Sequence, residues 1–516
     1  MMNANFPETL ATAMLASCQS DPGVTAWFNM DGADQVVTLE EVVRQARGVA
    51  MGLSRLGLAR GDVLAVQTPA NPTTMVVHAA AAWLGLTLLP IIHIYGGAEL
   101  EFILRQSGAK ALVTPQSWRR IDFPARRALM RDAFPDLIHI VEGEETGAIA
   151  FATLATGDEL GDPVAVGPDD VALLVYTSGT TSEPKGVQHS HRSLLAELAA
   201  DREMRGALRS LSPWPPGHIA GVLSLMRFWA MGQAGAFMDA WDGPTAARLI
   251  EQYRIQATSG TPFHITTLLD AAQADGRDLS SLSDYMAGAT MIPPTLIERC
   301  QQAGLATYRA YGLSEHPTIS SGTPADPIEK RLGTDGRLMP GVEVQIVDDA
   351  GNVLPVGGEG EIWSRGPDRF VGYRDAQRNA EALAADGWLR TGDIGRLDAD
   401  GYLAITDRKK DIIIRGGENI ASREVEDMLC LIPGVVEAAV VGSPDPLLGE
   451  RVCAFLVVAP GTVIDLADVQ RHFGSQQVAR QKTPEQVHIV ADLPRNTAGK
   501  VLKPDLRAML REPATA

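Results

Sequence analysis

Apolar and polar residues alternate along residues 1–165 in a repeating order of helix-like and strand-like stretches. Apolar residues recur with helical spacing at 39–56 and 100–106. Short apolar runs typical of buried strands lie at 63–68 and 111–114. Strands that alternate with helices in this way predict an α/β fold with parallel strands.

The alternation returns in residues 246–274, and the pattern then changes between about 332 and 405. Short β runs at 342–347 and 360–364 are separated there by glycine-containing turns. A run of short strands with turns predicts a small antiparallel barrel or sheet.

The last hundred residues carry a compact α+β pattern of their own. The pattern predicts helices at 423–431 and 466–473 and strands at 435–441 and 452–458. A charged cluster at 407–411 precedes this region. We therefore place a domain boundary at Lys410, which divides the chain into residues 1–409 and 410–516.

Composition is that of a globular protein, with 516 residues of which 45% are hydrophobic and 21% charged. A chain of this length exceeds one hydrophobic core and predicts two or more domains. The formal net charge of −18 argues against nucleic acid as a partner, because phosphate binding requires a basic surface. The four cysteines lie far apart without a CxxC spacing, which disfavours zinc and redox motifs and favours a reducing cytoplasm.

Two segments are apolar enough to be considered as a signal peptide or a membrane span. Residues 1–20 lack a basic start and read as an amphipathic helix, not a signal peptide. Residues 75–94 are apolar, but Pro90 divides them into an alanine-rich helix and a strand-like pair. A buried helix followed by a strand is favoured over a membrane span.

The segment Tyr176–Gly186 combines hydroxyls, glycines and one lysine directly after the apolar run 171–175. Free N–H groups, hydroxyl donors and a cation in one loop predict a polyphosphate cradle. It is not a Walker A loop, because Lys185 precedes its glycine and Val187 stands where a hydroxyl is needed. The alternative is a polar surface loop after a strand.

Five further segments are unusually polar, namely Tyr311–Glu315, Thr391–Asp393, Asp407–Asp411, Gly416–Asn419 and Pro494–Lys500. The first could stack a base, approach a phosphate and hold Mg²⁺. The carboxylate of the second could accept both hydroxyls of a ribose. Taken singly, each has a plainer alternative: a turn, a solvated linker, a loop before a helix or a flexible tail.

Together and in this order, these segments resemble the adenylate-forming superfamily, which contains acyl-CoA synthetases, peptide-synthetase adenylation domains and luciferases. The match is closest to acyl-CoA synthetases, whose GGENI segment resembles Gly416–Ile420 and whose C-terminal domain resembles residues 435–450. The resemblance implies a large N-terminal domain of doubly wound α/β subdomains plus a small β-barrel. It also implies a small, mobile α+β C-terminal domain.

The resemblance also implies a site. Residues expected to contact the nucleotide are Thr177, Ser178, Gly179, Thr180, Thr181, Gly288, Ala289, Tyr311, Gly312, Ser314, Asp393, Arg408, Gly416, Gly417 and Glu418. Among them, Tyr311 would stack on adenine, Ser314 would touch the α-phosphate, and Asp393 would hold the ribose beside Arg408. Ser314 departs from the usual threonine but keeps the hydroxyl.

Four residues are expected to carry the chemistry. Lys185 would neutralise the phosphates, and Glu315 would bind Mg²⁺. Lys500 would reach the carboxylate and the α-phosphate, and Lys410 would be the hinge between two productive domain arrangements.

Trp214, His218 and His316 are the candidate acyl-pocket residues. His218 falls where the family has an aromatic residue or a histidine beside the pocket; a packed histidine is the alternative. A pocket bounded by these side chains favours a medium-length, alicyclic or aromatic acid. Two departures from the family pattern are His316-Pro317 and the triplet 421–423 after the GGENI segment. The first leaves acyl specificity open, and the second leaves the contacts of the thioester stage open.

The implied activity is ATP-dependent conversion of a small carboxylic acid to an acyl-adenylate, then to a thioester of coenzyme A. ATP, Mg²⁺ and coenzyme A would be required, without nucleic acid or a transmembrane segment, and the resemblance allows a homodimer. Loading of a carrier protein's pantetheine arm shares all these motifs. Amino-acid activation is disfavoured, because His218 replaces an acidic partner for the ammonium group. A non-catalytic ligand sensor is disfavoured by the retained charged residues.

Overall fold

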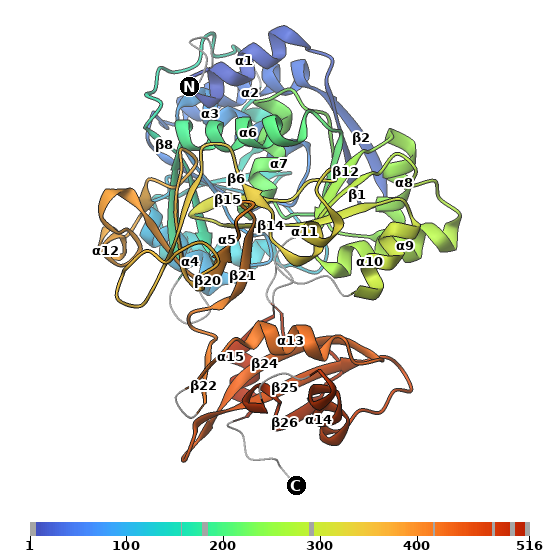
Figure 1. Ribbon diagram of the computed structural model, residues 1–516. Coiled ribbons are helices and arrows are strands. Elements are labelled where there is room, and N and C mark those ends of the chain that lie inside the picture. The colour runs from blue at the N-terminus through green and yellow to red at the C-terminus, as the bar shows by residue number, and fades with distance from the viewer. Residues whose placement is uncertain are drawn as a thin grey trace.

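The computed structural model describes residues 7–155, 157–177, 184–287, 294–415, 418–476, 480–495 and 501–510. A large lobe holds the N-terminal four fifths of the chain, and a smaller lobe lies beneath it in Figure 1. The smaller lobe carries the helices and strands labelled from β22 onward. This arrangement confirms the predicted large N-terminal and small C-terminal domains.

Two sheets form the frame of the large lobe. The first has nine strands in the order β16 (Arg337–Leu338), β15 (His316–Ser321), β14 (Ala306–Leu313), β13 (Asp284–Ala287), β12 (Ala257–Gly260), β10 (Ser210–Ser212), β11 (Gly235–Met238), β1 (Thr25–Met30) and β2 (Ala33–Thr38). The second has eight strands in the order β19 (Gly372–Tyr373), β9 (Lys185–Ser190), β8 (Val171–Thr177), β4 (Thr87–Pro90), β3 (Val63–Val66), β5 (Ala111–Pro115), β6 (Ile138–Glu142) and β7 (Ile149–Ala150). The central strands of both sheets are parallel, as the alternating pattern predicts.

Helices cover both faces of each sheet. The helices whose apolar side chains share a core between the two sheets are α1 (Leu10–Ser20), α2 (Leu39–Arg55), α3 (Pro72–Leu84), α6 (His191–Arg205) and α7 (Ile219–Trp229). The outer face of the nine-stranded sheet packs on α8 (Gly243–Tyr253), α9 (Pro262–Asp275) and α10 (Pro294–Gln302). The outer face of the eight-stranded sheet packs on α4 (Gly97–Ser107) and α5 (Phe123–Ala133).

The apolar segment 75–94 forms the helix α3 and the strand β4 and is buried from residue 75 to residue 93, whereas Ile94 is exposed. Asn71 caps α3 by accepting a hydrogen bond from the Thr74 amide, and Pro72 occupies its first turn. Gly85 ends the helix with φ of 70°, a left-handed conformation that favours glycine. Across the described parts of the chain, we find no helix that combines the length and apolar character needed to cross a bilayer.

A third sheet occupies the region where the pattern changes. Its four antiparallel strands are β17 (Glu343–Val347), β18 (Gly360–Arg365), β20 (Leu389–Leu397) and β21 (Leu403–Arg408). The pattern predicted a small antiparallel barrel or sheet here, and the described strands form a sheet with β17 and β21 at its two edges. The short helix α12 (Asn379–Ala382) lies between β19 and β20.

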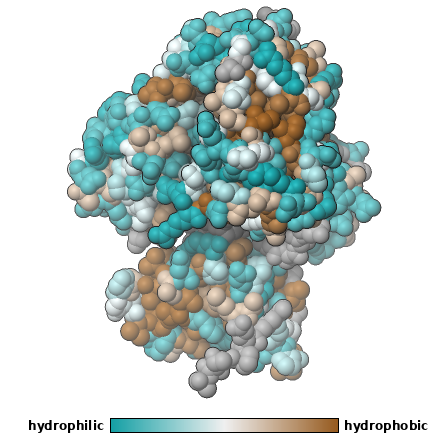
Figure 2. All heavy atoms as spheres, turned by 180° about the vertical axis from the view of Figure 1, so that it is seen from behind, coloured by the Kyte–Doolittle hydropathy of each residue, from teal (hydrophilic) through white to brown (hydrophobic). Residues whose placement is uncertain are grey.

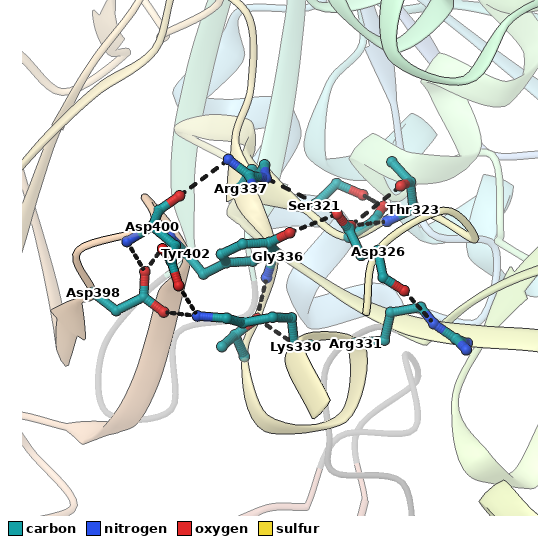
Figure 3. A network of polar contacts seen from close by, with 12 residues as sticks. Ser321, Thr323, Asp326, Lys330, Arg331, Gly336, Arg337, Asp398, Asp400 and Tyr402 are labelled. Carbon is teal, nitrogen blue, oxygen red and sulfur yellow. Dashed lines mark hydrogen bonds and ion pairs between the residues drawn. The ribbon is translucent and has the colours of Figure 1, made fainter. Parts of the chain in front are cut away.

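A polar network ties the third sheet to the segment that follows β15 (Figure 3). Lys330 of α11 (Ile328–Gly333) donates to Asp398 and Asp400, each at 2.7 Å. The Tyr402 hydroxyl donates to Asp326 at 2.7 Å. These contacts join the two segments that carry the predicted site residues 311–315 and 391–408.

The small lobe is built on the hairpin of β24 (Val435–Asp445) and β25 (Gly449–Val458). Its sheet is completed by β22 (Ile413–Arg415), β23 (Glu418–Ile420) and β26 (Gln486–Ile489). Helices α13 (Ser422–Leu429) and α14 (Leu466–Ser475) pack on one face, and α15 (Lys503–Met509) packs on the other. Seen from behind, hydrophilic residues cover much of both lobes, and hydrophobic residues gather in separate areas (Figure 2).

Candidate functional site

Several predicted site residues of the large lobe lie where the parallel strands of the nine-stranded sheet end. Tyr311 lies near the end of β14, and Trp214 and His218 follow β10. Because β10, β12, β13 and β14 run parallel in register, their carboxyl ends lie along one edge. Such an edge is where ligands bind in α/β sheets.

Asp393 joins three segments that are far apart in the sequence. Its carboxylate accepts a hydrogen bond from the Tyr311 hydroxyl at 2.7 Å and pairs with the Arg408 guanidinium at 3.2 Å. The Asp393 residue is only 3% exposed. Burial, and then the nearby Asp393 charge, raise the pKa of the Tyr311 phenol well above its usual value. The phenol therefore remains a hydrogen-bond donor across the working pH range.

Gly312 lets the chain turn between Tyr311 and Glu315. A Cβ atom at this position would lie 1.9 Å from the Pro317 carbonyl oxygen, so any larger residue would force the backbone apart. The Ser314 carbonyl beyond it accepts a hydrogen bond from the His189 Nε2 atom at 2.7 Å. Burial lowers the pKa of His189 to about 4, so this donor is a neutral imidazole that fixes the Ser314 backbone.

Glu315 and Lys185 share one aromatic neighbour. The Tyr373 hydroxyl donates to Glu315 Oε1 at 2.6 Å, and the Lys185 ammonium lies 5.3 Å from the centre of the Tyr373 ring. Lys185 begins β9 and pairs in register with Thr177 at the end of β8. An acidic side chain from the β14–β15 turn and a basic side chain from β9 thus contact the same tyrosine. Burial and the Glu315 charge raise the pKa of that phenol, which keeps it a donor.

Nine of the predicted site residues lie outside the described residues. They are Ser178, Gly179, Thr180, Thr181, Gly288, Ala289, Gly416, Gly417 and Lys500. Their roles stay predictions from the sequence. Glu418 is described and is exposed on β23.

Trp214 and His218 form a stacked pair, with ring centres 5.6 Å apart. The Trp214 indole donates to Ser259 Oγ at 2.7 Å, and His218 Nδ1 caps α7 by accepting from the Ala220 amide at 3.2 Å. Burial lowers the pKa of His218 to about 4. At neutral pH His218 is therefore uncharged and does not offer a cation to a carboxylate.

The structure corrects the prediction for His316. This residue is fully buried, with Nδ1 at 2.9 Å from Ser364 Oγ and Nε2 at 3.1 Å from Asp368 Oδ1. Both ring nitrogens are used inside the protein, so the ring holds β15 to the third sheet region. His316 does not line an acyl pocket.

The residues on either side of Lys410 are bound to the small lobe. Asp407 accepts hydrogen bonds from the Ser422 amide at 2.5 Å and its hydroxyl at 3.0 Å, and Asp411 pairs with Arg507 at 3.0 Å. Burial lowers the pKa of Lys410. The link between β21 and β22 is thus anchored through its flanking aspartates.

Two residues of this region were missed by sequence reasoning. Tyr373 contacts Glu315, as described above, but it stands in a short strand without a recognisable motif. Glu197 is 1% exposed within α6, accepts from the Thr318 hydroxyl at 2.7 Å, and has its pKa raised to about 8 by burial. A lone carboxylate among the leucines and alanines of 194–200 was the available signal.

Glu315 is the carboxylate that the sequence predicts as a ligand for Mg²⁺. A group of three or more metal-binding side chains is not found among the described residues. One carboxylate nevertheless fits Mg²⁺, which keeps several waters and binds through one or two carboxylates together with substrate phosphates.

Comparison with known proteins agrees with this geometry. Residues 15–374 match the AMP-binding enzyme family, and residues 424–500 match the AMP-binding enzyme C-terminal domain. The medium-chain fatty-acid–CoA ligase of Escherichia coli is 35% identical over 87% of this chain and 81% of its own. A Mycobacterium tuberculosis ligase is named for joining a methyl-dioxo-octahydro-indenyl propanoyl group to CoA. It is 36% identical over 92% of this chain and 94% of its own.

A solved structure is also similar. ATP-bound MatB from Rhodopseudomonas palustris superposes with a TM-score of 0.88 at 27% identity, covering 98% of this chain and 99% of that one. The two sequence relatives are named as CoA ligases, and the solved structure holds ATP. The chain therefore belongs to the AMP-binding enzyme family, within the adenylate-forming superfamily.

Proposed function

We propose that this protein is an AMP-forming acid–CoA ligase, which activates a carboxylic acid with ATP and transfers the acyl group to coenzyme A. The main observation is that two polar clusters lie at the two ends of the β14–β15 turn. Tyr311, Asp393 and Arg408 form the first cluster. Glu315, Tyr373 and Lys185 form the second. The first cluster suits a nucleoside, and the second suits its phosphates.

The nucleoside half of the site is prepared by hydrogen bonding. Asp393 is held by Tyr311 and Arg408, so its remaining lone pairs are oriented before a ligand arrives. We assign them to the ribose hydroxyls, and the Tyr311 ring to the adenine face. Because a carboxylate accepts about four hydrogen bonds, two protein donors leave room for two ligand donors.

The phosphate half depends on opposite charge. We assign Lys185 and the loop Thr177–Thr181 to the β- and γ-phosphates, Ser314 to the α-phosphate, and Glu315 to Mg²⁺. Bound Mg²⁺ would offset charge on the phosphates. The Tyr373 hydroxyl donates to one Glu315 oxygen, which orients the carboxylate and leaves the other oxygen for the ion.

The first reaction joins two anions. A substrate carboxylate oxygen forms a bond to the α-phosphorus, the bond to the β-phosphate oxygen breaks, and pyrophosphate leaves with the electron pair. Positioning and charge stabilisation dominate such a step. We assign Lys500 to the developing charge on the carboxylate and the α-phosphate. In the second reaction the CoA thiolate attacks the acyl carbon, and AMP leaves.

The two reactions call for different surroundings, so we propose a rotation about Lys410. The hinge separates residues 1–409 from 410–516. In the structure Asp407 accepts a hydrogen bond from Ser422, and Asp411 forms an ion pair with Arg507 of the small lobe. A rotation that withdraws the Lys500 segment and brings in Gly416, Gly417 and Glu418 must rearrange these ties.

We propose a medium-length, alicyclic or aromatic acid as substrate. The stacked Trp214–His218 pair offers a flat, uncharged wall for such an acid. The name of the E. coli relative specifies medium-chain fatty acids, and that of the M. tuberculosis relative specifies a fused-ring dione. Free coenzyme A is preferred over a carrier protein as acceptor, because these relatives are named as CoA ligases.

A panel of carboxylic acids incubated with ATP, Mg²⁺ and coenzyme A tests the proposal. AMP, pyrophosphate and thioester should form in equal amounts with at least one medium-length or cyclic acid. Pyrophosphate without CoA thioester would redirect the proposal to carrier-protein loading, and no AMP with any acid would refute it. Sizing of the same sample tests the homodimer. The four free cysteines support the proposed reducing cytoplasm.

A further inference from the structure

One segment of the chain, residues 364–373, contacts both Glu315 and the residue after it, His316. We call this segment the strap. It runs from the end of β18 to the end of β19, and β19 pairs with β9. The strap therefore joins the β14–β15 turn, which carries Glu315, to the strand that begins with Lys185.

The strap holds Glu315 at two points. The Phe370 amide donates to the Glu315 carbonyl at 2.7 Å, and the Tyr373 hydroxyl donates to Glu315 Oε1 at 2.6 Å. The first contact fixes the backbone of Glu315, and the second fixes its carboxylate. A shift of the strap would thus move both the main chain and the side chain of the residue that we assign to Mg²⁺.

His316 holds the strap from inside the protein. Its Nε2 atom lies 3.1 Å from Asp368 Oδ1, and its Nδ1 atom lies 2.9 Å from Ser364 Oγ. A neutral ring satisfies both partners when Nε2 donates to the carboxylate and Nδ1 accepts from the hydroxyl. His316 is 0% exposed and Asp368 is 3% exposed. The first half of the strap is thus bound at two places to one buried ring.

The ring also packs closely against Gly366, which lies between its two partners in the chain. A Cβ atom at Gly366 would lie 2.9 Å from His316 Nε2 and 2.8 Å from Asp368 Oδ1, and contacts below 3.0 Å are too close for a Cβ atom. The φ angle of Gly366 lies outside the left-handed region. Glycine is therefore needed here for space and not for its backbone conformation.

Asp368 depends on His316 for its position. Its second carboxylate oxygen, Oδ2, is buried and has no hydrogen-bond partner within the described residues. Loss of the His316 contact would leave a buried carboxylate without a hydrogen-bond partner in the described part of the chain, which is strongly unfavourable. The carboxylate would then turn toward water and carry the strap with it.

We propose that His316 is a positioning residue for metal binding, which holds Asp368 and thereby keeps the strap and the Glu315 carboxylate in the orientation that binds Mg²⁺. The inference rests on the proposed function, which assigns Mg²⁺ to Glu315. Residues that orient a metal ligand without touching the metal change metal affinity by about 10–100-fold. This role also accounts for His316-Pro317, one of the two departures from the family pattern.

Two substitutions separate the two contacts of the His316 ring. A glutamine amide reaches the position of Nε2 and can keep the Asp368 contact. An asparagine amide reaches only the position of Nδ1 and can keep the Ser364 contact. His316→Asn should therefore weaken metal binding, and His316→Gln should restore it close to the wild-type value.

Manganese(II) is the probe, because it takes the same oxygen ligands as Mg²⁺ and gives an EPR signal when free in solution. It is titrated into each enzyme together with α,β-methylene-ATP, whose α–β bridge cannot be cleaved, so that binding is measured without turnover. We expect the dissociation constant of manganese to rise about tenfold in His316→Asn. Deuterium exchange at the amides of the strap should also become faster, because the strap is less firmly held.

A second variant and a control complete the experiment. Gly366→Ala displaces the His316–Asp368 pair without removing the histidine, and it should change both quantities in the same direction. His139→Asn is the control, because His139 is 6% exposed on β6, which is separated from β9 by β8, β4, β3 and β5. This control should leave manganese affinity and strap exchange at their wild-type values.

Wild-type manganese affinity in His316→Asn, or in Gly366→Ala when His316→Asn does not fold, would overturn the inference. An equal loss of affinity in His316→Asn and His316→Gln, or in His316→Asn and His139→Asn, would overturn it as well. If the wild-type enzyme binds no manganese beside the ATP analogue, or releases no pyrophosphate with any acid, the proposed function is overturned instead, and this inference with it.

Discussion

Replacing Tyr311 by phenylalanine removes one hydroxyl from the nucleoside half of the site and keeps the aromatic ring. In the structure this hydroxyl donates to Asp393 at 2.7 Å. Asp393 is 3% exposed and keeps its Arg408 contact in the variant. If Asp393 holds the ribose, its carboxylate will be less firmly oriented, while stacking on adenine is preserved.

The size of the effect follows from the type of hydrogen bond. A hydrogen bond from a neutral donor to a charged group contributes about 1.5–3 kcal/mol net in proteins. Part of this free energy is lost from folding, and part is lost from nucleotide binding. If about 1.4 kcal/mol appears in binding, KM for ATP rises about tenfold. KM for the acid should change little, because Tyr311→Phe leaves the Trp214–His218 wall intact.

Initial rates of pyrophosphate release, measured against ATP and then against acid, separate these quantities. Tyr285→Phe is the matched control. Its phenol is also buried and donates to the Thr261 carbonyl at 2.8 Å, but it lies on the opposite face of the sheet from α6 and α7, among the α8–α9 side chains. This control should lower the thermal midpoint and leave KM for ATP unchanged.

The reasoning fails if Tyr311→Phe leaves KM for ATP at the wild-type value. It also fails if Tyr285→Phe raises KM for ATP to the same extent, since the effect would then reflect a general loosening of the sheet. A fall in kcat with unchanged KM would place the Tyr311 hydroxyl in the chemical step and not in nucleotide binding.

Four further predictions concern pH, charge and the hinge. Burial raises the pKa of the Glu197 carboxyl from 4.5 to about 8. The stability that depends on its protonated form is therefore fully present below pH 4.5 and is lost as pH rises toward 8. The free energy of unfolding should fall over this range by on the order of 5 kcal/mol. The difference in melting temperature between Glu197→Gln and wild type should therefore shift in favour of the variant as pH rises from 5 to 8. A difference that does not change with pH would contradict the burial argument. Lys500→Ala should abolish acyl-adenylate formation but largely spare thioester formation from supplied acyl-AMP, and equal loss of both half-reactions would remove its role. Lys410→Pro should slow thioester formation more than adenylation, because proline restricts the backbone at the hinge; unchanged half-reactions would argue against a hinge there. Glu315→Ala should raise the Mg²⁺ concentration for half-maximal rate or abolish turnover, whereas wild-type metal dependence would exclude it as a ligand.

Much of the fold could be predicted because its signals are local. The helices predicted at 39–56 and 466–473 are α2 and α14, and the apolar segment 75–94 is a buried helix and strand. Each depends on the spacing of apolar residues among near neighbours and on caps within a few residues. The region after residue 332 was predicted as a barrel or a sheet, because closure depends on pairing between the first and last strands, which local patterns do not reveal.

The candidate site divides in the same way. The sequence order of the motifs predicted Tyr311, Asp393 and Arg408 together, and the structure brings these three into contact. It could not predict Tyr373 beside Glu315, a contact between residues 58 positions apart. Nor could it predict that both ring nitrogens of His316 form hydrogen bonds inside the protein, since their partners lie 48 and 52 positions later in the chain.

By itself, the sequence determined the α/β layers, the two domains and the adenylate-forming chemistry, because periodicity and motif order are properties of consecutive residues. Only the tertiary structure decided which polar side chains share a buried environment. Ser212, Arg205 and Arg227 come from a strand and two helices, and each is unremarked as a single residue. Packing α6 and α7 on the sheet removes these groups from water and pairs the charges. Burial depends on the folding of the whole chain, so no local sequence pattern could predict it.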